Sequence, residues 1–92
     1  MKLQLKNVKV FEAMSEETTA FYADVYANGK KICYAKNDGR GGETYYHPYE
    51  NCRDEINLIE EFYKNSPPKK YRDFEIEMSL TMAIDDLLEE FR

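Results

Sequence analysis

Hydrophobic and polar residues alternate along the first half of the chain with the two-residue period of a β-strand. In residues 2–11 the apolar positions change parity near Lys6 and Asn7, which predicts a strand with a bulge. The next alternating run, residues 18–27, is rich in aromatic and β-branched side chains. These two runs predict the first two strands of a sheet.

An Asn-Gly dipeptide at positions 28–29 separates this run from a third alternating run. Asn and Gly tolerate the positive φ angles that both central positions of a type I′ hairpin turn require. Counted outward from a two-residue loop without a bulge, the register pairs Val25 with Ile32 and Asp24 with Cys33. We therefore expect Val25 to face the core and Cys33 to lie on the more polar face of the sheet.

Three of the four glycines fall in residues 37–42, which predicts a loop after the third strand. Residues 43–47 then predict a short fourth strand. We expect Pro48 to end it, because proline lacks the N–H group that a strand ladder requires.

Apolar residues recur at helical spacing twice in the second half of the chain. Residues 50–64 predict an amphipathic helix, which two consecutive prolines stop shortly afterwards. A second helix is predicted over residues 79–91. Its start has two interpretations: Asp73 caps a longer helix, or residues 74–78 form a strand and Ser79 caps a shorter helix. The shorter helix is favoured because the strand lets the apolar residues of 74–78 become buried.

This order of elements predicts an α+β fold, with an antiparallel sheet of three to four strands followed by two helices packed on one face. At 92 residues the chain fits a single domain, 1–92, with the sheet in residues 2–47. A domain of this size leaves little stability for a strained active site, so a binding function is favoured over an enzyme.

The net charge of −5 is unevenly distributed. Residues 1–48 contain seven Lys or Arg and six Asp or Glu, whereas residues 49–92 contain six and twelve. Because nucleic-acid affinity comes largely from cations that contact phosphates, no direct DNA binding is expected from an acidic chain without a dense basic tract. An acidic half suits a basic protein partner.

Localisation follows from the absence of apolar runs. No run approaches the roughly 18 residues that cross a bilayer, and residues 1–10 do not resemble a signal peptide. Two cysteines far apart in the sequence are expected to be reduced. We expect a cytoplasmic protein without a membrane partner.

Candidate catalytic and metal-binding residues are few. The chain has one histidine, His47, and two cysteines, Cys33 and Cys52, with no spacing typical of a metal site. A nucleophilic mechanism would need one of these cysteines near His47, and nothing in the sequence places them together. We therefore expect no catalytic residue, no metal and no cofactor, and a packing role for Cys52.

Carboxylates on the polar sides of the predicted helices are candidates for protein binding. Such residues usually form a solvated helix face, and the alternative is an acidic surface that meets a lysine- and arginine-lined partner. The candidate residues of this surface are Glu60, Glu61, Asp85, Asp86, Glu89 and Glu90.

The glycine-rich loop is a candidate for anion or nucleotide binding. Successive glycines allow backbone N–H groups to converge on an anion, and nearby cations and a tyrosine ring add charge and a stacking surface. The alternative is a wide hairpin loop that needs glycine only for its turns. The candidate ligand-binding residues are Lys36, Asn37, Asp38, Gly39, Arg40, Gly41, Gly42 and Tyr45.

Residues 19–26, the Asn-Gly-Lys-Lys of 28–31 and the Asn-Asp-Gly-Arg-Gly-Gly of 37–42 together resemble small uncharacterised proteins of phages and mobile elements. In that family a hairpin bearing Gly-Lys precedes a loop of this type. The resemblance implies a setting in which short acidic proteins block host defence machinery in the host cytoplasm, and it assigns no catalytic residue.

The sequence thus supports two functional hypotheses. The first is a non-enzymatic interaction protein, similar in style to anti-CRISPR proteins, that inhibits a host defence nucleoprotein through its acidic helical surface. The second is a protein that sequesters a nucleotide or another anionic small ligand at the glycine loop. A homodimer is compatible with the tyrosines and a free sheet edge.

Overall fold

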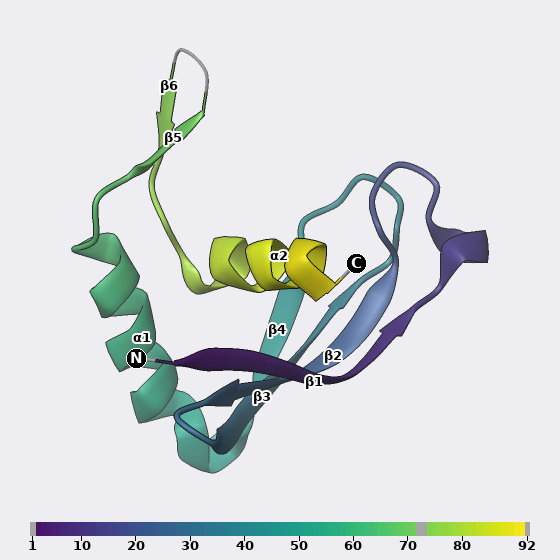
Figure 1. The fold of residues 1–92 in the computed structure, drawn as a ribbon. Helices are drawn as coiled ribbons and strands as arrows, with labels where there is room; N and C mark the ends of the chain where they lie inside the picture. The colour runs from purple at the N-terminus through teal and green to yellow at the C-terminus, as the bar shows by residue number, and fades with distance from the viewer. Residues whose placement is uncertain (1, 72–73, 92) are drawn as a thin grey trace.

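The computed structural model describes residues 2–71 and 74–91 of the chain and confirms the α+β fold. Four antiparallel strands form the main sheet, two helices follow, and a two-stranded hairpin connects the helices (Figure 1). The strands of the main sheet are β1 (Leu3–Val10), β2 (Phe21–Ala27), β3 (Lys30–Asn37) and β4 (Tyr45–Pro48). The other elements are the short 3-10 turns η1 (Glu12–Met14) and η2 (Glu50–Cys52), the helices α1 (Arg53–Lys64) and α2 (Leu80–Phe91), and the hairpin strands β5 (Lys69–Tyr71) and β6 (Phe74–Ile76).

The sheet has the order β1-β2-β3-β4, and both helices pack on one of its faces. The helices contribute Ile56 and Ile59 from α1 and Leu80, Ile84 and Leu88 from α2 to a core shared with the sheet. The sheet residues of this core are Phe21, Ala23, Val25, Ala27, Ile32, Cys33 and Ala35. Apolar side chains at every second strand position therefore meet the apolar stripes of both helices, as the two periodicities predict.

The bulge predicted in the first strand is confirmed. The register between β1 and β2 shifts between Lys6 and Lys9, and Asn7 adopts a positive φ of 53°. The bulge lets apolar residues on both sides of it pack against the core, although their sequence parity changes.

The predicted register of the β2–β3 hairpin is wrong beyond its first two pairs. The structure pairs Val25 with Cys33 instead of Ile32, because a bulge follows the pair Tyr26–Lys31. Cys33 consequently lies on the core face, where it is fully buried, and not beside Asp24 on the polar face. The extra residue allows two consecutive apolar side chains, Ile32 and Cys33, to be buried together, which a regular strand does not allow.

The shorter version of the last helix is confirmed. The Ser79 hydroxyl accepts a hydrogen bond from the Met82 N–H at 3.2 Å, and residues 74–76 form a strand. The alternative cap, Asp73, lies outside the described residues. The partner strand β5 was not predicted, because the Pro-Pro-Lys-Lys sequence before it is typical of a loop.

No helix within residues 2–71 and 74–91 has the length and apolar character that a bilayer span requires.

Candidate functional site

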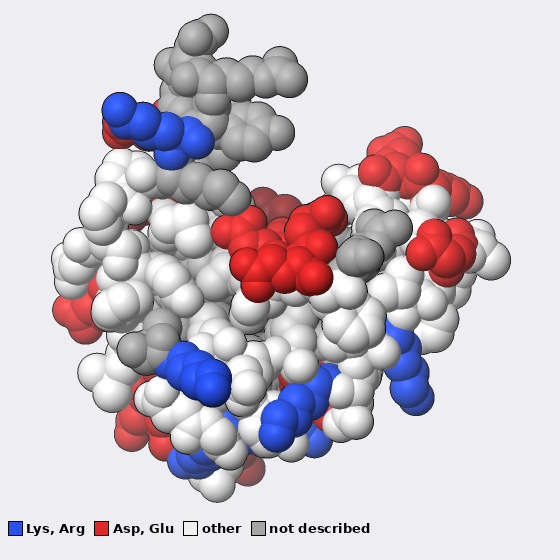
Figure 2. All heavy atoms as spheres, in the orientation of Figure 1, with Lys and Arg blue, Asp and Glu red and all other residues white. Residues whose placement is uncertain are grey.

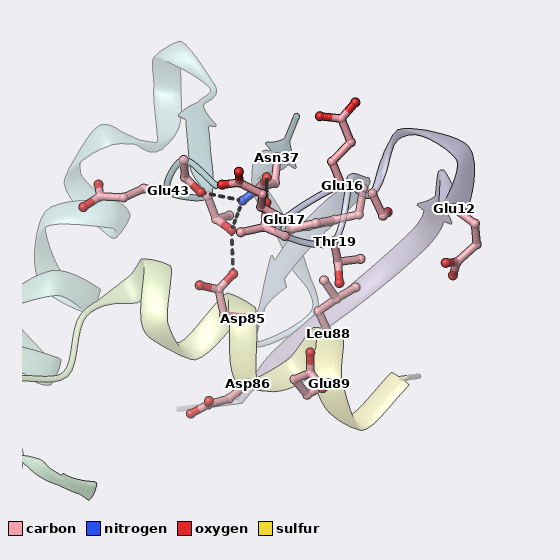
Figure 3. Close-up of a pocket in the computed structure, with 15 residues that line it drawn as sticks. Glu12, Glu16, Glu17, Thr19, Asn37, Glu43, Asp85, Asp86, Leu88 and Glu89 are labelled. Carbon is pink, nitrogen blue, oxygen red and sulfur yellow. Dashed lines mark hydrogen bonds between the residues drawn. The ribbon is translucent and has the colours of Figure 1, made fainter. Parts of the chain in front are cut away.

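An acidic groove lies between α2 and the two loops that approach it, the β1–β2 connection and the β3–β4 connection (Figure 3). Its volume is about 610 Å³. Figure 2 shows acidic side chains gathered over α2 and over the neighbouring loop region. No lysine or arginine is among the described residues that line the groove. Its carboxylates come from Glu12, Glu16, Glu17, Glu43, Asp85, Asp86 and Glu89.

The wall formed by the β1–β2 connection is held in place by the carbonyl group of Gly39. This oxygen accepts hydrogen bonds from the N–H groups of Glu16 at 3.0 Å, Glu17 at 2.9 Å and Thr18 at 3.4 Å. Gly39 is itself buried and has a φ of 81°, which favours glycine. A glycine in the β3–β4 loop therefore positions two glutamates of another loop.

The floor of the groove is a chain of hydrogen bonds from the sheet to α2. The buried amide nitrogen of Asn37 donates to the Thr44 hydroxyl oxygen at 3.2 Å, and this hydroxyl donates to Asp85 Oδ1 at 2.6 Å (Figure 3). The Asn37 side-chain oxygen accepts the Thr18 hydroxyl and the Gly39 N–H, each at 2.8 Å. Because these side chains all have hydrogen-bond partners, the series of bonds joins both loops and the helix into a single ordered unit.

Asp85 is partly buried at the floor of the groove. Burial raises the pKa of its carboxyl group, the hydrogen bond from Thr44 opposes this change, and repulsion from Asp86 and Glu89 adds to it. The ionised form of Asp85 is therefore less favourable here than in water. A cation in the groove would stabilise the ionised carboxylate.

The structure divides the predicted acidic surface. Asp85, Asp86 and Glu89 line the groove, whereas Glu61 is exposed on α1 and Glu90 lines a separate hollow beside β1.

Glu60 has an internal role. Its carboxylate accepts a hydrogen bond from the Leu80 N–H at 2.6 Å and another from the Tyr46 hydroxyl at 2.9 Å. It thus joins α1, β4 and the first turn of α2. A negative charge at a helix N-terminus is favourable, so this contact stabilises the fold.

Four groove carboxylates, those of Glu12, Glu16, Glu17 and Glu43, were not predicted as part of the surface. The Glu16-Glu17 pair is visible in the sequence, but it belongs to the half of the chain with a balanced charge. Only the packing of two loops against α2 brings these residues beside the acidic helix.

The predicted ligand-binding residues are spread over the β3–β4 loop and the neighbouring strands, and three of them, Lys36, Asn37 and Asp38, line one hollow. The N–H of Gly39 donates to Asn37, and that of Gly41 donates to the Thr18 hydroxyl at 3.4 Å. Lys36 and Tyr45 instead lie opposite each other on the face of the sheet away from the helices. Internal hydrogen bonds thus occupy these two loop amides, so the geometry favours a structural loop, and anion binding there stays a prediction.

Cys33 and His47 lie on opposite faces of the sheet. Cys33 and Cys52 are buried as free thiols, and burial raises the pKa of Cys33 to about 12. His47 pairs with Tyr34, the neighbour of Cys33 on β3, so the imidazole and this thiol point to opposite faces of the sheet. Within the described part of the chain, no group of three or more His, Cys, Asp or Glu residues is arranged to hold a metal ion.

No protein-family model, curated protein or solved structure matches the chain. The resemblance to small phage proteins therefore stays a prediction. A function for the chain is therefore inferred from its fold and from the positions of its charged and aromatic side chains.

Proposed function

We propose that the chain is a non-enzymatic interaction protein whose acidic groove binds a lysine- or arginine-rich segment of a partner protein. The observation that carries this proposal is that seven acidic residues line one groove whose described lining contains no cation. Three segments that are distant in the sequence contribute them, so the cluster is a product of the fold.

Electrostatics favour a cationic partner. Burial raises the pKa of Asp85, and repulsion from the neighbouring carboxylates of Asp86 and Glu89 adds to the increase. A bound arginine or lysine removes part of the repulsion and gains charge-assisted hydrogen bonds. Complementary charge also accelerates the encounter between the two proteins.

A basic protein or nucleoprotein surface fits this groove. The resemblance of residues 19–26, 28–31 and 37–42 to small phage proteins adds a biological setting, in which the partner is a host defence nucleoprotein and the chain is its inhibitor. A groove that offers carboxylates to cations that otherwise contact nucleic acid would compete with that nucleic acid.

The test uses an arginine- and lysine-rich peptide and two variants with the same change in charge. Replacing Glu16 and Glu89 by glutamine removes two charges from the groove, and the control replaces Asp54 and Glu61, which are exposed on α1, by asparagine and glutamine. We expect the groove variant to bind the peptide about two- to thirtyfold more weakly than the parent, with the control close to the parent. Affinity should fall as salt is added.

Equal weakening in both variants would show that the peptide responds only to net charge, and the groove would then have no specific role. Peptide binding that is independent of salt would also contradict the proposal.

A further inference from the structure

The face of the main sheet opposite the helices carries lysines and aromatic rings in rows across the strands. One cross-strand row consists of Lys9, Tyr22, Lys36 and Tyr45, and the next consists of Lys6, Asp24, Tyr34 and His47. Tyr26 and Lys31 form a third pair across β2 and β3. Because alternate residues of a strand point to the same face, these side chains share one surface, which we call the open face.

The rings of the open face are ordered by contact with one another. Tyr34 stacks on Tyr22 with ring centroids 5.6 Å apart and on His47 with centroids 4.8 Å apart. Lysine ammonium groups lie over two further rings, Lys6 above Tyr26 at 4.4 Å and Lys31 above Tyr49 at 5.3 Å. The face is thus a prearranged aromatic platform with cations between its rings.

The carboxylate in these rows is buried and has internal partners. Asp24 is 4% exposed and accepts hydrogen bonds from the Asn7 amide at 2.8 Å and from the Tyr22 hydroxyl at 3.0 Å. Lys31 lies 3.6 Å from it. Asp24 therefore orders the platform from beneath, while the lysines remain exposed.

A hollow of about 640 Å³ continues the first row toward the η1 turn. Its walls include Phe11, Met14 and Tyr22, and its charged lining residues are Lys9, Lys36 and Asp38, so lysines outnumber the single carboxylate. Phe11 is 43% exposed and Met14 is 54% exposed, so apolar groups face solvent here. The size and the mixture of ring, thioether and cation suit a flat heterocycle that is attached to a phosphate.

We propose that the open face binds single-stranded nucleic acid, with one base in the hollow against Tyr22 and the phosphates beside Lys9, Lys36, Lys6 and Lys31. Unpaired bases stack on aromatic rings, and a groove or platform with lysines follows their backbone. A duplex keeps its bases paired and offers no ring face to the hollow. The open face therefore suits a single strand better than a double helix.

The four lysines of this face are distributed along β1 and β3, and no basic tract joins them in the sequence. Antiparallel pairing brings them together on one side, while the acidic groove lies with α2 on the other side. The local potential at the open face is consequently positive although the whole chain carries a charge of −5. The hollow of the open face and the acidic groove have different charged lining residues, although both are lined by Phe21 and Asn37.

The test measures the fluorescence anisotropy of labelled oligo-dT and oligo-U strands of about 12 nucleotides, with polyglutamate and a DNA duplex as competitors. We expect a dissociation constant of about 10⁻⁴ to 10⁻⁶ M and a slope of log affinity against log salt near about −2.8, which corresponds to four lysines. Replacing Lys9 and Lys36 by glutamine should reduce the slope to about −1.4. The matched control replaces Lys30 and Lys64 by glutamine, because these lysines lie at the hairpin end and on α1, and its slope should stay near that of the parent.

The contribution of the Phe11 ring, which forms a wall of the hollow, is tested separately. Phe11→Ala should weaken binding at least about fivefold, because one stacking surface of the hollow is lost. Phe62→Ala removes a ring of similar exposure from α1, 52% against 43% for Phe11, and should have no effect.

Three results would overturn the proposal. They are the absence of oligonucleotide binding at low salt, competition by polyglutamate or duplex as strong as that by a single strand, and equal losses in the lysine variant and its control. Urea unfolding of each variant establishes that the losses do not come from misfolding.

Discussion

Replacing Gly39 by alanine is expected to destabilise the protein much more than the same change at Gly29. The two glycines have nearly the same backbone conformation, with φ angles of 81° and 83°. A Cβ atom at Gly29 meets nothing within 4 Å, whereas one at Gly39 would lie 2.9 Å from Ala20 Cβ and would overlap the carbonyl oxygen of Met14. Gly29→Ala is therefore a matched control for the conformational cost alone.

The magnitudes follow from these contacts. A left-handed conformation costs a residue with a side chain about 1–2 kcal/mol, and both variants pay this cost. Overpacking at Gly39 adds about 1–3 kcal/mol, and any shift of its carbonyl group also weakens the three hydrogen bonds from residues 16–18. The free energy of unfolding should thus fall by about 1–2 kcal/mol in Gly29→Ala and by about 2–5 kcal/mol in Gly39→Ala.

Urea unfolding followed by circular dichroism measures both changes. With an m-value near about 1 kcal/mol/M, the midpoint of Gly39→Ala should lie about 1–3 M below that of Gly29→Ala. Similar midpoints for the two variants would refute the account of the Gly39 contacts. A changed m-value would show instead that the variant alters the denatured state or the two-state character of unfolding.

Two further predictions concern carboxylates around α2. Glu60→Ala should lower the free energy of unfolding by about 2–3 kcal/mol, because it removes charge-assisted hydrogen bonds to the Leu80 N–H and the Tyr46 hydroxyl. The control, Glu61→Ala, should change this free energy by less than about 0.5 kcal/mol. Equal effects of the two variants in urea unfolding would contradict the internal role of Glu60. The pKa of Asp85 is raised in the folded state, so its ionised form destabilises the fold at neutral pH, and this penalty is lost as the pH falls through the folded pKa toward the unfolded value of about 3.9. Asp85→Asn should therefore be more stable than the parent at pH 7, with a difference that disappears in acid, and a pH-independent difference between the two unfolding curves would rule out this explanation.

Several elements were predictable because local physics decides them. The Asn-Gly dipeptide favours a tight hairpin wherever it separates two alternating runs, and both residues have positive φ in the structure. Ser79 caps α2 because its hydroxyl reaches an N–H three residues later, a distance that the helix itself sets. The parity change near Asn7 marked the bulge of β1 in the same way.

Other features depended on relations between distant segments. The bulge at Ile32 was not predicted, because residues 30–36 also fit a regular strand with Cys33 on the polar face. The burial of two consecutive apolar side chains, Ile32 and Cys33, in the core decided for the bulged strand. The same shift placed Tyr34 opposite Asp24, which completes the aromatic rows of the open face. The predicted surface residue Glu60 became an internal acceptor because α2 begins beside it.

By itself the sequence determined the kinds of element, their order and most of their boundaries, because steric preferences and burial periodicity act over a few residues. Only the tertiary structure decided which charged residues lie close together. The acidic groove joins residues 12–17 with α2, and the open face joins lysines of two strands, because register and packing direction bring these positions together. Composition specifies how many charges the chain carries, and only the fold gathers seven acidic residues around the groove and four lysines on the open face.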